Sequence, residues 1–169
     1  MKFKKLITGL IAASMATMAV NGIAATDTAT LNISATAVTG CAFDANSYNI
    51  NFGNYDGSAV ASTSVSIGFT CATAAVPYTI EANNGSNFDA GTGDRRITDG
   101  AGNYLAYDLF KDGGFTQPLG TIAAGTGLTG TSGSAGVSNS ITIYAGMPAS
   151  QAIGAAGSYT DTVTLTLTF

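Results

Sequence analysis

Two segments, one near each end of the chain, alternate apolar and polar side chains without a break. In residues 29–37 the apolar positions are Ala29, Leu31, Ile33, Ala35 and Ala37, and in residues 163–169 they are Val163, Leu165, Leu167 and Phe169. A period of two predicts a β-strand with one buried face. Neither strand has an obvious hairpin partner beyond it, which suggests that another molecule completes the fold.

Strand signals recur between these two segments, whereas helix signals are scarce. Alternating, aromatic or β-branched stretches predict strands over 65–71, 78–81, 104–110 and 141–145. Turn sequences separate them, among them Asn84-Gly85, Asp99-Gly100 and Asp112-Gly113-Gly114. Short strands joined by glycine-rich turns indicate an all-β sandwich. We interpret the Gly/Ser/Thr-rich stretch 125–136 as a mobile loop between two strands.

The first 25 residues have the pattern of a secretory signal peptide. Lys2, Lys4 and Lys5 precede an apolar run from Leu6 to Val20, and small residues follow up to Ala25. We place the cleavage after Ala24 or Ala25. A transmembrane anchor is the alternative, but the run contains Thr and Ser, is followed by Asn21 and is short against the roughly 20 apolar residues that a span needs.

Charge and cysteine content narrow the function classes for the remaining chain. Three basic side chains, Arg95, Arg96 and Lys111, stand against ten acidic ones, so the net charge after cleavage is about −7 by direct count. The sequence therefore shows no basic footprint for nucleic acid and no polybasic membrane patch. In an exported chain, the two cysteines Cys41 and Cys71 predict one disulfide. A metal site built on them would lack partners, because the chain contains no histidine.

Candidate catalytic or cofactor-binding chemistry is sparse. Without histidine, a Ser-His-Asp or Cys-His site cannot be built. Residues 125–130 match G-x-G-x-x-G, but the following Thr131-Ser132-Gly133 does not open a helix, so we assign no phosphate-binding role and expect no cofactor. Asp89, Asp94 and Asp99 fit no calcium-loop spacing and are interpreted as turn residues. The pair Arg95-Arg96 either binds an anion or forms ion pairs with aspartates, and we favour the ion pairs.

Several local sequences occur in the order seen in one protein family. The alternating N-terminal segment leads into Gly40-Cys41, and the second cysteine ends a strand. Motifs in between and beyond are, in chain order, Ile50-Asn51-Phe52-Gly53-Asn54-Tyr55, Pro77-Tyr78-Thr79-Ile80, Arg95-Arg96, 104–112 and Gly157-Ser158-Tyr159-Thr160-Asp161-Thr162-Val163. Together they resemble the spore coat protein U domain family, the subunits of archaic chaperone–usher pili, over nearly all of the chain after the signal.

This resemblance implies an incomplete immunoglobulin-like β-sandwich that a donor strand from another subunit completes. It divides the chain into a signal peptide (1–25), a donor-strand extension (26–40) and a pilin domain (41–169). The donor strand would be residues 28–38, with Ala29, Leu31, Ile33, Ala35 and Ala37 facing inward. The edge of the acceptor groove would include Val163, Leu165, Leu167 and Phe169. A periplasmic chaperone, an outer-membrane usher and neighbouring subunits are the implied partners, and a cell-surface pilus that supports attachment and biofilm formation is the implied destination.

Other interpretations stay open at this stage. Residues 29–37 could be the first strand of the chain's own sandwich. The protein could instead be a monomeric secreted module that binds carbohydrate through Tyr104, Tyr107 or Tyr144. Within a pilus, the sequence does not distinguish a shaft subunit from a minor or adaptor subunit.

Overall fold

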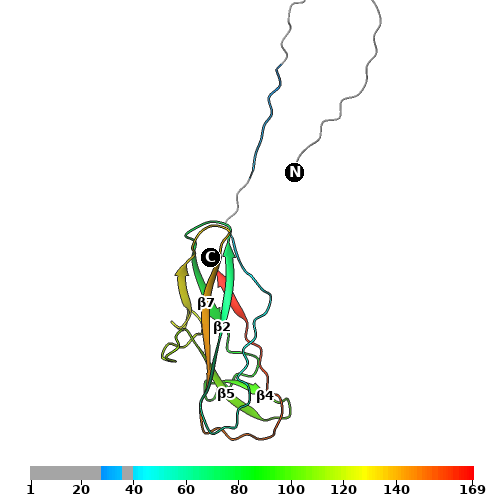
Figure 1. Cartoon of the computed structure of the whole chain (residues 1–169), viewed down its shortest axis with the longest axis vertical. Helices are drawn as coiled ribbons and strands as arrows, with labels where there is room; N and C mark the ends of the chain where they lie inside the picture. Colours follow the sequence, from blue (N-terminus) through cyan, green and yellow to red (C-terminus); the bar gives the residue numbers. More distant parts are fainter. Residues whose placement is uncertain (1–27, 36–39) are drawn as a thin grey trace, which may run out of the picture. The chain divides into compact units, whose positions relative to one another are not determined.

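The described part of the protein consists entirely of β-strands, turns and loops. The computed structural model describes residues 28–35 and 40–169, and it divides the chain into two units, Met1–Thr36 and Ala37–Phe169. The signal-peptide prediction, and Ala37 of the predicted donor strand, lie outside the described residues. The second unit (Figure 1) contains β1 (Cys41–Phe43), β2 (Ala61–Cys71), β3 (Pro77–Ala82), β4 (Arg95–Thr98), β5 (Tyr104–Phe110), β6 (Leu128–Thr131), β7 (Ser138–Met147) and β8 (Leu165–Thr168).

These strands form two antiparallel sheets. One has the order β1-β2-β7-β5-β4 and the other the order β6-β3-β8. The central ladder joins β2 to β7 from Ala61↔Met147 to Thr70↔Ser138. The prediction of an all-β fold is therefore confirmed, with two packed sheets.

The core lies between the sheets and follows the period-two alternation of the strands. Ile67, Leu109 and Ile143 of the five-stranded sheet and Ile80 of the three-stranded sheet are almost completely buried. Their polar neighbours along each strand face outward, as in Ser66 and Thr142, which are exposed. Side chains that alternate in this way bury one face of each sheet and expose the other. The exposed face therefore carries polar Ser and Thr side chains, although the chain contains few charged residues.

The predicted disulfide is present and closes one end of the sandwich. Cys41 and Cys71 are register partners in the β1–β2 ladder and are bonded to each other. We call this end, where β2 finishes and β7 starts, the disulfide end. The opposite end, where β2 starts at Ala61 and β7 finishes at Met147, is called the far end.

The interpretation of 125–136 as one loop is wrong, because β6 lies inside it. Leu128 turns inward and pairs with Ile80, so that β6 forms the edge of the smaller sheet. Gly130 is required there, since a Cβ at this position would lie 2.6 Å from the Tyr78 hydroxyl oxygen. The run of Gly, Thr and Ser concealed a strand whose one large apolar residue is Leu128.

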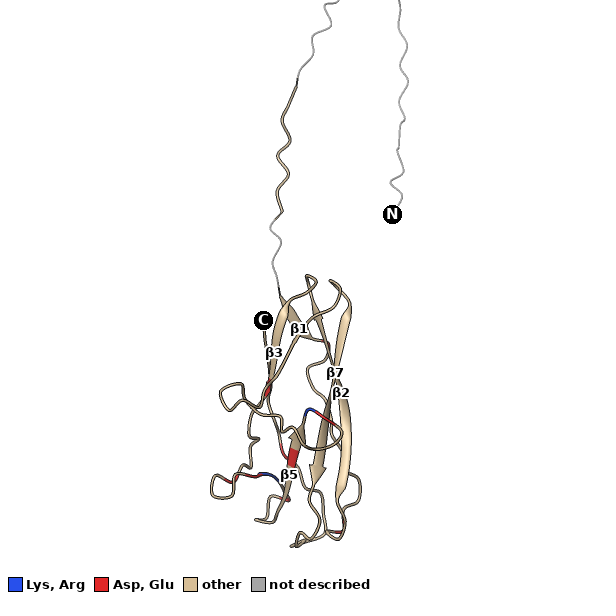
Figure 2. Ribbon diagram, turned by 90° about the vertical axis from the view of Figure 1, so that its left-hand side faces the viewer, with Lys and Arg blue, Asp and Glu red and all other residues tan. Residues whose placement is uncertain are grey.

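Arg95 ties the two sheets together. It is 7% exposed, and its guanidinium donates to the carbonyl oxygens of Asn83 (3.0 Å) and Leu119 (2.9 Å) and to Asp108 Oδ1 (2.6 Å). Arg96 pairs with Asp89 at 2.8 Å and stacks on Tyr104. The ion-pair interpretation of both arginines is confirmed. In Figure 2 the few charged residues, coloured blue and red on the ribbon, lie mainly in the half of the body that holds β5.

Candidate functional site: an open groove beside β8

A groove of about 1000 Å³ opens along one side of the sandwich. Its floor consists of inward-facing core residues. Its two walls are chain segments that, over most of their length, are not paired with a strand of either sheet. The floor includes Val65, Ile67, Leu105, Tyr107, Leu109, Ile143 and Met147. Five of these are at most 4% exposed, so the groove reaches the core of the protein rather than its outer surface.

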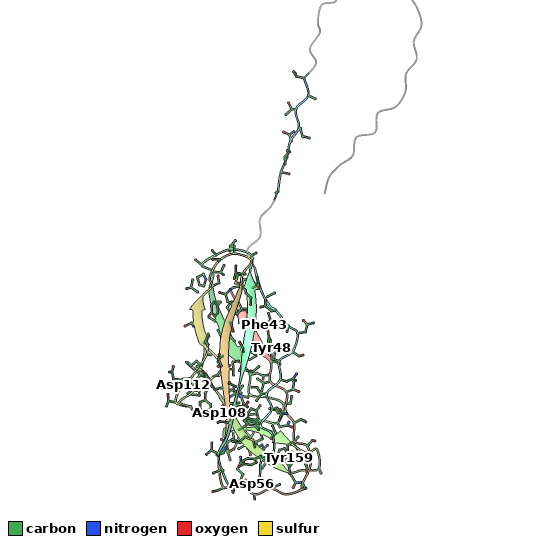
Figure 3. All side chains as sticks on the ribbon, viewed as in Figure 1. Phe43, Tyr48, Asp56, Asp108, Asp112 and Tyr159 are labelled. Atoms are coloured by element: carbon green, nitrogen blue, oxygen red, sulfur yellow. A yellow bond between two sulfur atoms is a disulfide. The ribbon has the colours of Figure 1, made fainter. Side chains whose placement is uncertain are left out.

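The first wall is the segment 48–55, which follows β1. Tyr48, Ile50 and Phe52 are half-buried, whereas Asn49 and Asn51 between them are exposed. The segment thus has the side-chain alternation of a strand, yet no ladder includes it among the described residues. Hydroxyl groups hold it in place: Tyr48 donates to the Gly68 carbonyl (2.7 Å) and Tyr55 to the Pro148 carbonyl. Figure 3 labels Phe43 and Tyr48, which follow each other on this side of the body.

The second wall runs from Ile153 through Tyr159 to Leu165 and continues into β8. The amides of Asn83 and Ser86 donate to the carbonyl oxygens of Thr164 (3.0 Å) and Thr162 (3.1 Å). Successive residues of a strand direct their backbone groups to opposite sides. The backbone groups of Val163 and Leu165 therefore point away from β3, toward the side on which β8, the last strand in the order β6-β3-β8, has no neighbour.

Asp161 fixes this second wall to the rest of the body. Its Oδ1 accepts hydrogen bonds from the backbone amides of Ser86 (2.9 Å) and Asn87 (3.2 Å), and its Oδ2 accepts one from the Tyr107 hydroxyl (2.7 Å). Burial, and then the bond to Asp161, raise the pKa of Tyr107 above its ordinary value. The phenol therefore stays neutral and donates to the carboxylate, which links the floor of the groove to its wall.

The sequence-predicted groove-edge residues fall in two groups. Val163 and Leu165 line the groove and are half-buried. Leu167 packs with Phe69 and Ile80 in the core near the disulfide end, and Phe169 is 55% exposed. The structure thus brings together the first two with the floor residues and leaves the last two beyond the groove lining.

The predicted donor residues Ala29, Leu31, Ile33 and Ala35 lie in the other unit. Residues 28–35 form no helix or strand, and none of the ladders among the described residues includes them. Leu31 and Ile33, the two large apolar residues of the alternation, are 81% and 85% exposed, and Ala29 and Ala35 are exposed as well. The donor role itself stays a prediction. The structure does not show residues 29–35 as a strand of the chain's own sheets.

Sequence reasoning missed the wall at 48–55 as part of the site. It identified Ile50–Tyr55 only as a family motif, although the alternation Tyr48-Asn49-Ile50-Asn51-Phe52 is itself a strand signal. The structure also separates the tyrosines proposed for carbohydrate stacking. Tyr107 lies in the groove floor, whereas Tyr144 packs edge-on against Phe115 at the outer face, and the ring of Tyr104 is stacked with the guanidinium of Arg96.

Neither a cluster of metal-ligand side chains nor a membrane-spanning helix occurs among the described residues. These residues contain no group of three His, Cys, Asp or Glu side chains placed to hold a metal ion. In the same residues, no helix has the length and apolarity to cross a membrane. The groove combines an apolar floor with hydrogen-bonding backbone along one wall, which is chemistry suited to binding an extended polypeptide.

Comparisons with known proteins agree with the fold. The chain is similar in structure to a chain in the pre-assembly complex of chaperone CsuC with tip adhesion subunit CsuE from archaic chaperone–usher Csu pili of Acinetobacter baumannii. The TM-score is 0.56 with 22% sequence identity, and the match covers 78% of this chain and 40% of that one. The chain thus spans less than half the length of that relative. The comparison with curated proteins returns no match.

The family model named Spore Coat Protein U domain matches residues 27–166. This range includes the N-terminal alternating segment, both cysteines, both walls of the groove and the first part of the C-terminal alternation, up to residue 166. Since the match extends over most of the chain, the protein belongs to the Spore Coat Protein U domain family.

Proposed function

We propose that this protein is a structural subunit of a chaperone–usher pilus and that its groove receives the N-terminal segment of another subunit. The observation that carries the proposal is the groove itself, which exposes the core beside a strand edge with no neighbour. An open hydrophobic core and an unpaired strand edge promote aggregation unless something covers them. An inserted strand would cover both at once.

The chain itself supplies a segment of matching chemistry. Residues 29–37 alternate small or apolar side chains with polar ones and contain no charge. In β-strand addition, the backbone of the incoming segment pairs with the free edge, and every second side chain enters a pocket. Leu31 and Ile33 would then be the large plugs over the floor, with Ala29, Ala35 and Ala37 as the small ones.

The same groove accounts for the export partners. A subunit with an exposed core needs a partner that covers the groove before assembly, and a periplasmic chaperone would do so. An outer-membrane usher would then exchange the chaperone for the next subunit, and the fibre would reach the cell surface. Attachment and biofilm formation are the expected roles of such a fibre. In this proposal the pilin domain is residues 41–169 and the extension is residues 26–40.

Deletion of residues 26–38 tests the proposal. We expect the shortened subunit to bind its chaperone and to fail to polymerise, because its groove is intact and its donor is missing. A matched control keeps the length of the segment but reverses its alternation of apolar and polar positions. In this variant Leu31 is exchanged with Asn32 and Ile33 with Ser34, so that both large apolar side chains move to the outward face. This control should also prevent polymerisation. Normal fibres from either variant would contradict donor-strand exchange.

The alternative of a monomeric carbohydrate-binding module has less support, because its three tyrosines do not form one platform. Size measurement after expression with and without the chaperone separates the two functions. A stable monomer that forms without the chaperone would favour the binding module.

A further inference from the structure

A second, smaller pocket of about 340 Å³ lies on the outer face of the five-stranded sheet at the far end. Its apolar lining includes Val60, Phe110, Phe115, Met147 and Pro148, and Asp94 and Asp108 also line it. Val60 is 67% exposed. Tyr107 and Met147 line both this pocket and the groove, whereas Phe110, Phe115 and Pro148 line this pocket and not the groove.

Phe115 is held over this pocket in a strained backbone conformation. Its φ is +55°, in the left-handed region that bulky residues rarely adopt. Its ring lies over Gly146, where a Cβ would be 3.4 Å from Phe115 Cδ1, and it packs edge-on against Phe110 with 5.3 Å between ring centroids. Strain of this kind persists where the surroundings impose it, and it marks candidate functional positions.

Asp112 imposes the conformation of this loop. Its carboxylate accepts hydrogen bonds from the amides of Thr116 (3.1 Å) and Gln117 (2.8 Å) and from the Thr116 hydroxyl (2.9 Å). Limited desolvation opposes ionisation of Asp112, but these bonds outweigh it and keep the pKa of the carboxyl below its ordinary value. Figure 3 shows Asp112 and Tyr159 on opposite flanks of the body, so the loop does not belong to the groove.

The disulfide end carries a complementary surface. Loops 72–76 and 132–137 form one unit, because the Ala75 amide donates to the Gly133 carbonyl and the Gly136 amide to the Cys71 carbonyl. Neither loop contains a charged residue, and the part of Figure 2 above the label β1 is uniformly tan. Val137 projects from this end and is 57% exposed.

Donor insertion would bring these two ends together. Every ladder in the described residues is antiparallel, and antiparallel pairing is the more stable arrangement. A donor antiparallel to β8 would run from the disulfide end toward the far end. Its last inward residue, Ala37, is four residues before Cys41, a reach of about 14 Å at most. The disulfide end of the donating copy must therefore lie within about 14 Å of the point where the donor leaves the groove, at the far end of the receiving copy.

We propose that, in the assembled fibre, Val137 and its loop from one copy pack into the pocket beneath Phe115 of the next copy. This inference rests on the proposed function and adds a second contact between bodies to the inserted strand. Both surfaces are apolar at their centres, and neither the pocket nor the two loops contributes a lysine or arginine. The contact would set the angle between successive subunits.

A cysteine pair tests this contact in whole fibres. In a Val60→Cys/Val137→Cys variant, oxidised fibres should give a ladder of covalent oligomers that survives boiling in SDS and collapses on reduction. The matched control, Ser66→Cys/Thr129→Cys, places two exposed cysteines on the outer faces of the two sheets and should give monomers after boiling. Monomers from the first variant, or equal ladders from both, would overturn the inference. Failure of the unmodified protein to form fibres would instead refute the proposed function.

A second measurement applies even if the cysteine variants assemble poorly. Phe115→Ser should leave fibre yield and the SDS-resistant ladder unchanged, because Phe115 is outside the groove, but the angle between neighbouring subunits in electron micrographs should lose its uniformity. Ile122→Ser, another exposed apolar residue, is the control and should keep the angle uniform. The same angular distribution in Phe115→Ser and wild-type fibres would overturn the inference.

Discussion

Truncating one plug of the donor segment should weaken the fibre without affecting the fold of the subunit. Ile33 is 85% exposed, and neither hydrophobic core cluster of the described residues contains it, so we expect Ile33→Ala to leave the core of the sandwich unchanged. In the fibre the same side chain would be buried over the groove floor. Full burial of an isoleucine side chain stabilises by about 1.5–3 kcal/mol.

The cost of Ile33→Ala follows from the loss of this buried side chain. Alanine retains one methyl group, and the vacated volume adds a cavity cost, so the loss is about 2–4 kcal/mol for each subunit contact. A tenfold change in an equilibrium constant corresponds to about 1.4 kcal/mol. We therefore expect the contact to weaken by roughly 30- to 700-fold, seen as a marked drop in the temperature at which isolated fibres dissociate in SDS.

Two controls decide whether the reasoning is correct. Asn32→Ala changes the adjacent outward residue and should leave the dissociation temperature within a degree or two of wild type, since surface substitutions usually cost under about 0.5 kcal/mol. Chemical denaturation of the chaperone-released subunit should be the same for Ile33→Ala and wild type. Fibres of Ile33→Ala that dissociate at the wild-type temperature, or an equal effect from Asn32→Ala, would refute the plug role.

Three further predictions concern the body of the subunit. Replacing Cys41 and Cys71 together by alanine should lower the free energy of unfolding by about 3–4 kcal/mol, because the disulfide closes a loop with a sequence separation of 30, and denaturant titration measures it. Tyr107→Phe should cost about 1.5–3 kcal/mol in the same assay, since Asp161 loses a hydrogen bond. Because the folded pKa of Asp112 lies below its ordinary value of 3.8, the stability from its bonds is complete above that value and is lost as the pH falls through the lower, folded pKa. The amide NMR signals of Thr116 and Gln117 should shift together in that acidic range, and a midpoint above 3.8 would contradict the bonds.

The sequence predicted the strands whose alternation is regular. Residues 104–110 match β5, and 65–71, 78–81 and 141–145 lie within β2, β3 and β7. It missed β1, β4 and β6, which are three or four residues long and offer little periodicity. In β4, Arg95 is buried, and its guanidinium is satisfied by hydrogen bonds to carbonyl oxygens and to Asp108. A charged residue is expected to face solvent, so the sequence gives no sign that this position faces inward. Local pattern cannot reveal a partner that is distant in the chain.

The groove was predictable only in part, for a related reason. Val163 and Leu165 were expected at its edge, and they line it. The wall at 48–55 and the floor depend on how the two sheets close over each other, which no single segment encodes. The anchoring of Asp161 by Ser86, Asn87 and Tyr107 likewise joins residues from three parts of the chain.

One measurement tests the central claim most directly. A photoreactive phenylalanine analogue placed at Phe52 would lie in the groove wall, and the same analogue at Phe110 would lie on the outer face of the sheet as a control. Irradiated fibres should yield adducts between position 52 and residues 28–38 of another copy, identified by mass spectrometry, and unassembled subunits should not. The control position should give no adduct to that segment. Fibres in which position 52 reacts only within its own chain, or in which both positions capture the segment equally, would contradict insertion of a neighbouring subunit's strand into this groove.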